Sequence, residues 1–228
     1  MGQRDSGLGC PVCGQALLRI GPCPNRWCRR SDRAFSVVFA VGTHGGALRR
    51  AVLRYKYRRE MWWADVFARL LADHLHAHTT WFEEFDLLVP TPAYAGPQAR
   101  RPWDPVGEIV ARLGRLVEPL WETAIGAVIK RAESPAMQGQ PWAERQAIAS
   151  GPLRRSLVVP NPRLVAGARI LVIDDVLTEG STLREVARVL RRAGAREVAG
   201  LVLARPVWRD VQKSGPKAPR SSGLDGRA

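Results

Sequence analysis

The sequence has no long apolar run and no leader-like N-terminus. None of its apolar segments approaches the roughly 20 residues that a membrane-spanning helix needs. The first ten residues also lack the basic and then apolar pattern of a secretory signal. These absences predict a cytoplasmic protein without a membrane span.

Acidic residues and lysine are both scarce. The chain has 35 Lys and Arg against 21 Asp and Glu, a net charge of +14, and only four of the basic residues are lysines. Arginine binds phosphate through paired hydrogen bonds, so an arginine-rich surface favours polyanions such as single-stranded DNA. A proteome-wide bias toward arginine predicts the same composition without any partner, and the sequence leaves both readings open.

Cysteine is confined to one end of the chain, since all four cysteines lie within the first 28 residues. Two residues separate Cys10 from Cys13, and four separate Cys23 from Cys28. The first spacing lets two thiolates bind one ion, and the second is within reach of the same ion. Because disulfides are rare in the cytosol, we predict a structural Zn²⁺ on these four thiolates. A saturated site of this kind has no open position for catalysis.

Composition divides the chain into three zones. We predict a zinc-binding element at 1–33, a globular domain at 34–210 and a disordered, polar tail at 211–228. Hydrophobic residues make up 46% of the chain, which is enough for a substantial core.

Apolar periodicity within the globular zone predicts strands that alternate with helices. The strands are expected at 35–41, 86–89, 124–129, 170–173 and 198–203, and the helices at 47–57, 63–75, 106–117 and 183–193. Residues 132–155 are expected to form a long loop. Apolar strands alternating with helices imply an α/β fold whose parallel sheet is covered on both faces.

A buried strand runs directly into two carboxylates. The apolar stretch 170–173 is followed by Asp174 and Asp175. Ligands of open α/β sheets bind beyond the carboxyl ends of the strands. Two adjacent carboxylates at such an end suit sugar hydroxyls or a hydrated Mg²⁺.

The residues after the two carboxylates have the composition of a phosphate loop. They include Thr178, Glu179, Gly180, Ser181 and Thr182. The free N–H groups and positive dipole at the start of the next helix attract phosphate, and the hydroxyls add donors. The pattern predicts a ribose 5-phosphate site. The alternative is an ordinary strand–turn–helix connection whose hydroxyls cap the helix.

The segment ILVIDDVLTEGST resembles the signature with which type I phosphoribosyltransferases bind 5-phosphoribosyl 1-pyrophosphate (PRPP). Glu179 is an acid at a variable position of that signature, and we expect its side chain to point away from the phosphate. Four other features extend the resemblance: the four-cysteine N-terminus and the segments GALRRAVLRYKYR, DLLVPTP and IKR. Together they resemble the ComF family, phosphoribosyltransferase-like proteins named for competence for DNA uptake.

The resemblance implies a type I phosphoribosyltransferase fold in which Asp174 and Asp175 are the catalytic pair and Mg²⁺ accompanies PRPP. Lys130 and Arg131 precede the variable loop and are candidates for pyrophosphate contact, although a surface charge pair is an equal alternative. One segment departs from the family. It reads Arg101-Pro102-Trp103-Asp104-Pro105 where the family usually has Arg-Gly-Phe-Asn-Gln.

Two functions stay open at this point. The protein is expected either to transfer a phosphoribosyl group from PRPP to an unidentified acceptor or to act without catalysis in DNA uptake or processing. In the second case its ligands would be nucleotides or single-stranded DNA, and its partners would be DNA-processing proteins.

Overall fold

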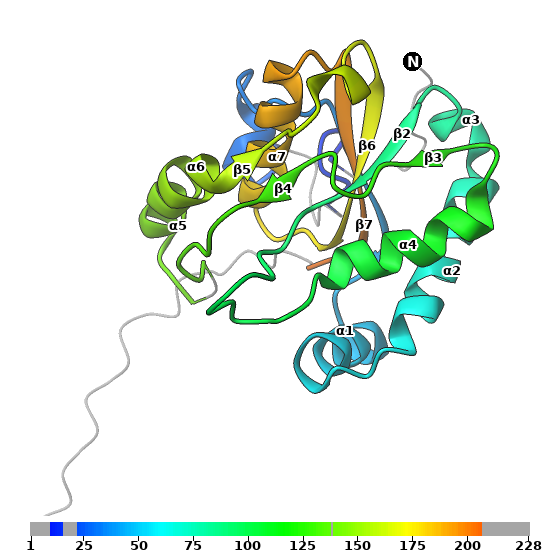
Figure 1. The fold of residues 1–228 in the computed structure, drawn as a ribbon, viewed down its shortest axis with the longest axis horizontal. Helices are drawn as coiled ribbons and strands as arrows, with labels where there is room; N and C mark the ends of the chain where they lie inside the picture. The colour runs from blue at the N-terminus through cyan, green and yellow to red at the C-terminus, as the bar shows by residue number, and fades with distance from the viewer. Residues whose placement is uncertain (1–9, 16–21, 138, 207–228) are drawn as a thin grey trace, which may run out of the picture.

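The computed structural model describes residues 10–15, 22–137 and 139–206 (Figure 1). The predicted tail at 211–228 and parts of the predicted zinc element lie outside these residues, so the proposed domain limits stay a prediction. Within the described ranges, no helix has the length and apolar character needed to cross a membrane.

A five-stranded parallel sheet forms the centre of the molecule, in the order β1-β7-β6-β2-β3. Its strands are β1 (Val38–Thr43), β2 (Leu87–Pro90), β3 (Glu122–Thr123), β6 (Arg169–Val176) and β7 (Glu197–Arg205). The inner strands β2, β6 and β7 are apolar almost throughout because helices cover both of their faces. The predicted parallel α/β architecture is confirmed.

Helices lie on both faces of this sheet (Figure 1). One face is covered by α1 (Gly46–Arg58), α2 (Trp63–Ala77) and α4 (Pro105–Val117), with the single turn α3 (Thr79–Phe82) after α2. The other face is covered by α7 (Ser181–Arg192). Side chains alternate along β6, so Leu171 and Ile173 pack toward α2 and α4, whereas Ile170 and Val172 pack toward α7.

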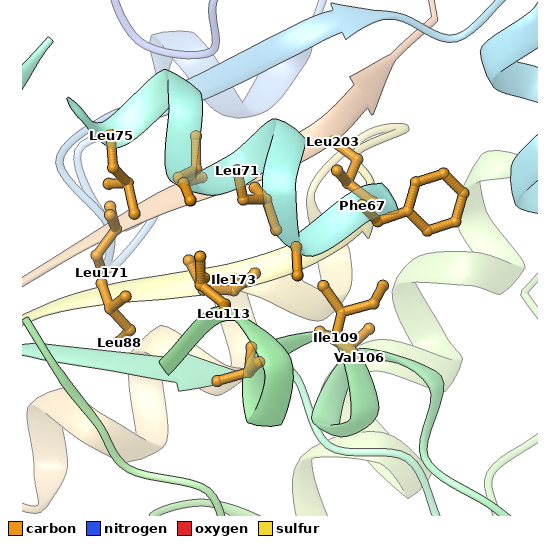
Figure 2. Close-up of a cluster of buried hydrophobic side chains, with 14 of the residues drawn as sticks. Phe67, Leu71, Leu75, Leu88, Val106, Ile109, Leu113, Leu171, Ile173 and Leu203 are labelled. Atoms are coloured by element: carbon orange, nitrogen blue, oxygen red, sulfur yellow. The ribbon is translucent and has the colours of Figure 1, made fainter. Parts of the chain in front are cut away.

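The larger core cluster is formed between α2, α4 and the sheet. Figure 2 shows side chains of both helices packed on those of β2, β6 and β7. The helix side chains are Phe67, Leu71, Leu75, Val106, Ile109 and Leu113, and the strand side chains are Leu88, Leu171, Ile173 and Leu203. This packing fixes the strand ends at which the candidate site lies.

Two predicted elements differ from the structure. The strand expected at 124–129 is wrong, because Gly126, with φ of +85°, turns the chain there. β3 ends before that turn, and β4 (Ile129–Lys130) pairs after it with β5 (Leu157–Val158) in a separate antiparallel ribbon.

The long loop expected at 132–155 is also wrong in part. It contains α5 (Trp142–Ile148), a π-helical turn (Ala149–Leu153) and α6 (Arg154–Ser156). These turns are too short for a periodic apolar pattern, and the burial of Ile148 and Leu153 against the rest of the protein stabilises them instead.

The helix α4 offers a matched test of the core. Leu113 is 0% exposed and Leu116 is 38% exposed on the same helix. Leu113→Ala should lower the free energy of unfolding by about 2–5 kcal/mol, because it leaves a cavity in a close-packed core. Leu116→Ala should change it by less than about 0.5 kcal/mol. Urea unfolding of both variants measures this, and equal losses would contradict the assigned helix face.

Candidate functional site

The two carboxylates lie near the C-terminal end of β6 but face opposite sides. Asp175 shares the face of Ile173 and reaches α1, where its Oδ2 lies 2.5 Å from Nζ of Lys56. Oδ1 of Asp174 accepts hydrogen bonds from Oγ1 of Thr91 and from the backbone N–H of Asp175, both at 2.9 Å. Both carboxylates line one cavity of about 530 Å³, which is within the range of small-molecule sites.

This carboxylate pair is electrostatically unfavourable without a ligand. Burial and then the neighbouring Asp175 raise the pKa of Asp174 to about 7, although Lys56 and Thr91 act in the opposite direction. A charged Asp174 therefore lacks sufficient compensation in this state. A cation or further hydrogen-bond donors entering the cavity would stabilise the ionised form.

The phosphate loop joins β6 to α7 along the same cavity, which Thr178, Glu179, Gly180, Ser181 and Thr182 line. Gly180 has φ of +90°, which is a conformation that favours glycine, and it occupies the N-cap position of α7. The cap residue therefore has no side chain to contribute. Helix capping by a hydroxyl does not account for the Ser and Thr residues of this loop.

The loop also presents unused backbone donors. Within the described ranges, no backbone or side-chain acceptor receives a hydrogen bond from the N–H groups of Thr178, Glu179 or Gly180. Consecutive free N–H groups beside the N-terminus of a helix form an arrangement suited to an anion.

Glu179 faces α5. Its buried carboxylate forms an ion pair with Arg145, and burial raises the pKa of Glu179 while Arg145 acts against that shift. Next to it, Nε2 of Gln146 donates a hydrogen bond of 3.1 Å to Oγ of Ser181. The segment 132–155, for which a long loop was predicted, thus contacts the predicted phosphate loop.

The side chains of Lys130 and Arg131, the two basic candidates before this segment, lie in different surroundings. Lys130 lines a second cavity of about 620 Å³, where its Nζ lies 3.2 Å from Oε1 of Glu133. Arg131 is exposed and lines neither of these cavities. The two cavities adjoin, because both are lined by Lys56, Tyr57, Pro92, Arg101, Met137 and Thr182.

The second cavity is cationic and aromatic. Its lining includes Lys56, Arg59, Arg100, Arg101 and Lys130 together with Tyr57 and Trp103. The guanidinium of Arg101 lies 5.0 Å from the ring centroid of Tyr57. Such a surface suits a ligand that carries both negative charge and an unsaturated ring.

The segment that departs from the family has a structural role. Oδ1 of Asp104 accepts hydrogen bonds from the N–H groups of Val106 and Gly107 at 3.1 and 3.0 Å, so it caps α4. Pro105 occupies the first turn of that helix, and Trp103 packs edge-on against Tyr55 with centroids 4.9 Å apart. An Asp-Pro pair ahead of an apolar helical pattern is a helix-start signal that the sequence contained.

The four cysteines meet in one cluster. All four Sγ atoms lie within 4.8 Å of one another, and those of Cys13 and Cys23 are 3.7 Å apart. A tetrahedral Zn²⁺ with Zn–S bonds of about 2.3 Å places its sulfur atoms about 3.8 Å apart, so the donor set and spacing fit this ion. Hydrogen bonds among the thiols lower the pKa of Cys10 and raise that of Cys28.

Sequence reasoning missed several residues that complete the site. Lys56 lies within the family segment GALRRAVLRYKYR without a role assigned to it, and Arg145 lies in the region 132–155 for which only a loop was predicted. No local signal marked Asn25, Thr91 or Arg205, because each is brought to the site from a distant part of the chain.

Comparisons with known proteins agree with this geometry. The model of the family described as "Phosphoribosyl transferase domain" matches residues 107–219. This match covers just under half of the chain and includes β6 and α7.

Two similar proteins have names that refer to competence and to DNA utilization. The chain is 26% identical to "Competence protein F" of Haemophilus influenzae, over 86% of this chain and 84% of the relative. It is 27% identical to "DNA utilization protein YhgH" of Escherichia coli K12, over 86% of this chain and 83% of the relative. The resemblance to ComF-type phosphoribosyltransferase-like proteins is confirmed.

Among solved structures, a hypoxanthine phosphoribosyltransferase from Staphylococcus aureus matches with a TM-score of 0.37 and 11% identity, over 62% of each chain.

The raised pKa of Asp174 predicts how stability depends on pH. The folded value of about 7 exceeds the unfolded value of about 3.9, so the folded state holds more protons between these values. The contribution of Asp174 to stability therefore falls as pH rises from about 4 to 7. Asp174→Asn retains an acceptor oxygen for both hydrogen bonds but carries no charge.

We expect ligand-free Asp174→Asn to be about as stable as the wild type near pH 4 and more stable at pH 8. The difference at pH 8 should be on the order of a few kcal/mol. Denaturant unfolding of both proteins across this interval measures it. A difference that stays constant with pH would contradict the assignment.

Proposed function

We propose that this protein binds PRPP, or a related ribose 5-phosphate ligand, together with Mg²⁺. The observation that carries the proposal is the common cavity of the Asp174–Asp175 pair and the phosphate loop. A ligand that carries a ribose diol and a 5-phosphate matches these two groups, because carboxylates accept from hydroxyls and backbone N–H groups donate to phosphate. The phosphoribosyl transferase domain supports the same ligand class.

In this proposal Asp174 and Asp175 accept hydrogen bonds from ribose hydroxyls or from metal-bound water. Lys56 holds Asp175 in the free protein and lines both cavities. A bound ligand competes for that carboxylate, and the ammonium of Lys56 can then pair with pyrophosphate oxygens. Lys130 lies in the second cavity and has the charge to do the same.

Mg²⁺ would neutralise part of the pyrophosphate charge, and the paired carboxylates have the oxygen donors that it prefers. The four cysteines would hold a structural Zn²⁺ outside the reaction. Transfer to an acceptor would break the bond between C1 of the ribose and a pyrophosphate oxygen and form a bond from C1 to the acceptor. Release of labelled pyrophosphate across a panel of bases distinguishes transfer from binding alone.

Asp175→Asn tests the ribose clamp. It preserves the size of the side chain but removes its charge and one acceptor oxygen. We expect PRPP affinity to fall about ten- to a hundredfold, equivalent to roughly 1.5–3 kcal/mol, by calorimetry with Mg²⁺ present. The melting temperature should change little, because relief of the repulsion from Asp174 offsets the lost pairing with Lys56.

The control is Asp65→Asn on α2, where the side chain of Asp65 is 61% exposed. It makes the same chemical change away from the cavities and should leave the affinity unaltered. If Asp175→Asn binds PRPP as tightly as the wild type, the carboxylate pair does not bind the ribose and is only a structural feature of the strand end.

The cationic and aromatic second cavity favours a second candidate function. We propose, as the alternative, that this surface binds single-stranded DNA, since a basic groove with aromatic rings is the usual means of holding a single strand. The names of the relatives, Competence protein F and DNA utilization protein YhgH, support a DNA-related role. Partners in DNA processing remain part of this alternative.

Salt dependence tests the DNA alternative. The logarithm of the affinity for an oligonucleotide should fall with the logarithm of salt concentration, by about 0.7 for each phosphate contacted. Arg101→Gln should reduce that slope by about 0.7. Arg192→Gln should leave the slope unchanged, because Arg192 is an exposed residue of α7 outside both cavities. Absence of binding at low salt would assign the positive charge to composition alone.

A further inference from the structure

Arg205 connects the cysteine cluster to the phosphate loop. It lies at the end of β7 and is 4% exposed. Its Nη2 donates to Sγ of Cys13 at 3.0 Å, while its Nη1 lies 3.3 Å from the carbonyl oxygen of Leu177 and 3.4 Å from that of Thr178. One buried guanidinium therefore contacts a predicted metal ligand and two consecutive carbonyls of the loop.

Asn25 makes a second connection between the same two parts. It lies between Cys23 and Cys28, is 3% exposed, and donates from Nδ2 to the carbonyl oxygen of Glu179 at 3.1 Å. Its Oδ1 accepts from the N–H of Trp27 and so caps the short 3₁₀ helix η1 (Arg26–Arg29). Asn25 is thereby held by the cysteine segment itself.

These contacts determine which way the loop's N–H groups point. The C=O and N–H of a trans peptide unit are directed oppositely, and the peptide units of this loop are trans. The carbonyls of Leu177 and Thr178 face the guanidinium of Arg205, and that of Glu179 faces Asn25. The N–H groups of the next residue in each unit, Thr178 to Gly180, therefore point away from Arg205 and Asn25, and these are the donors without an acceptor in the described ranges.

Apolar packing joins the same parts. Cys10, Cys13 and Cys23 belong to one buried cluster with Phe35 and Leu177. A Cβ atom at Gly180 would lie 3.5 Å from Cδ1 of Leu177 and 3.9 Å from Cζ of Phe35. The cysteine segment is thus packed directly beneath the loop, and a change in its arrangement would displace the loop.

We propose that Arg205 is a positioning residue that couples metal occupancy of the four-cysteine cluster to the conformation of the phosphate loop. Metal binding at Cys10, Cys13, Cys23 and Cys28 fixes the position of the Cys13 sulfur and of Asn25. Arg205 and Asn25 then hold three carbonyls so that the N–H groups are presented to a ligand phosphate. The inference rests on the proposed function, because the ligand whose affinity changes is PRPP.

The test compares PRPP affinity with and without Zn²⁺ in the full chain. Metal analysis should first give about one Zn²⁺ per chain. Calorimetry with excess Mg²⁺ is then performed on zinc-loaded protein and on protein stripped by a chelator that is removed beforehand. We expect the zinc-loaded protein to bind PRPP about 5- to 150-fold more tightly, which is the usual range of coupling between two sites.

Arg205→Met assigns this coupling to one residue. The variant should still hold one Zn²⁺, yet bind PRPP as weakly as stripped wild type, and its affinity should no longer respond to the metal. Arg205→Lys, which keeps the charge and a donor, should restore part of the response. Arg169→Met removes an arginine at the opposite end of the parallel strands and should leave the response intact.

If Arg205→Met does not fold, Asn25→Asp tests the coupling instead. Asn25→Asp keeps the oxygen that accepts from the N–H of Trp27 but loses the N–H donor to the carbonyl of Glu179. It should lower PRPP affinity several-fold at full zinc content. Equal affinity of loaded and stripped wild type, a purified protein without zinc, or an undiminished response in Arg205→Met would each overturn the inference. Failure of zinc-loaded wild type to bind PRPP would instead overturn the proposed function on which it depends.

Discussion

The placement of two adjacent carboxylates, the half-buried Asp174 and the buried Asp175, at the end of a strand covered on both faces is the constraint on which the site depends. Ionised carboxylates in such a position require compensation, and the fold supplies it from two directions. α1 brings Lys56 to Asp175, and the end of β2 brings Thr91 to Asp174. The compensation is incomplete, since the pKa of Asp174 stays raised. A strand end arranged in this way favours a ligand that completes the charge balance.

The same fold makes the N-terminal segment part of the site rather than an attachment to it. Cys10, Cys13 and Cys23 pack on the face of the sheet that α7 covers, below the loop that precedes α7. The guanidinium of Arg184 in α7 lies 3.7 Å from the ring of Trp27, which adds a further contact between this segment and α7. In the coupling proposed above, a metal ion bound there would act on the ligand through the backbone of the loop, without contact between metal and ligand.

The segment 101–105 differs from the family pattern in residues that determine how α4 begins. The glycine and amide positions of the family pattern are replaced by prolines and by an aspartate that caps α4. The basic and aromatic side chains of this segment, Arg101 and Trp103, nevertheless line the second cavity. The two prolines and the capping aspartate thus fix the start of α4, while Arg101 and Trp103 keep a positive charge and an aromatic ring in the second cavity.

Features that depend on neighbouring residues in the chain could be predicted from the sequence. The apolar run 170–173 followed by Asp174 and Asp175 predicted the strand and its polar end, and helical periodicity predicted α1, α2, α4 and α7 within a few residues. Local patterns suffice there because strand alternation and helix periodicity follow from backbone geometry. The spacing of the four cysteines likewise predicted a common set of metal ligands, and their four sulfur atoms lie within 4.8 Å of one another.

The side chains that complete the site could be identified only from the tertiary packing. Lys56, Thr91, Arg145 and Arg205 come from separate elements, and their contacts with the diacid and the phosphate loop depend on how those elements pack. The short helices at 142–156 depend on burial of a few side chains rather than on periodicity, and for that reason the sequence indicated a loop there. Long-range packing also sets the direction of the carbonyls of Leu177 to Glu179, since the residues that hold them, Asn25 and Arg205, lie 180 positions apart in sequence and meet only in the folded protein.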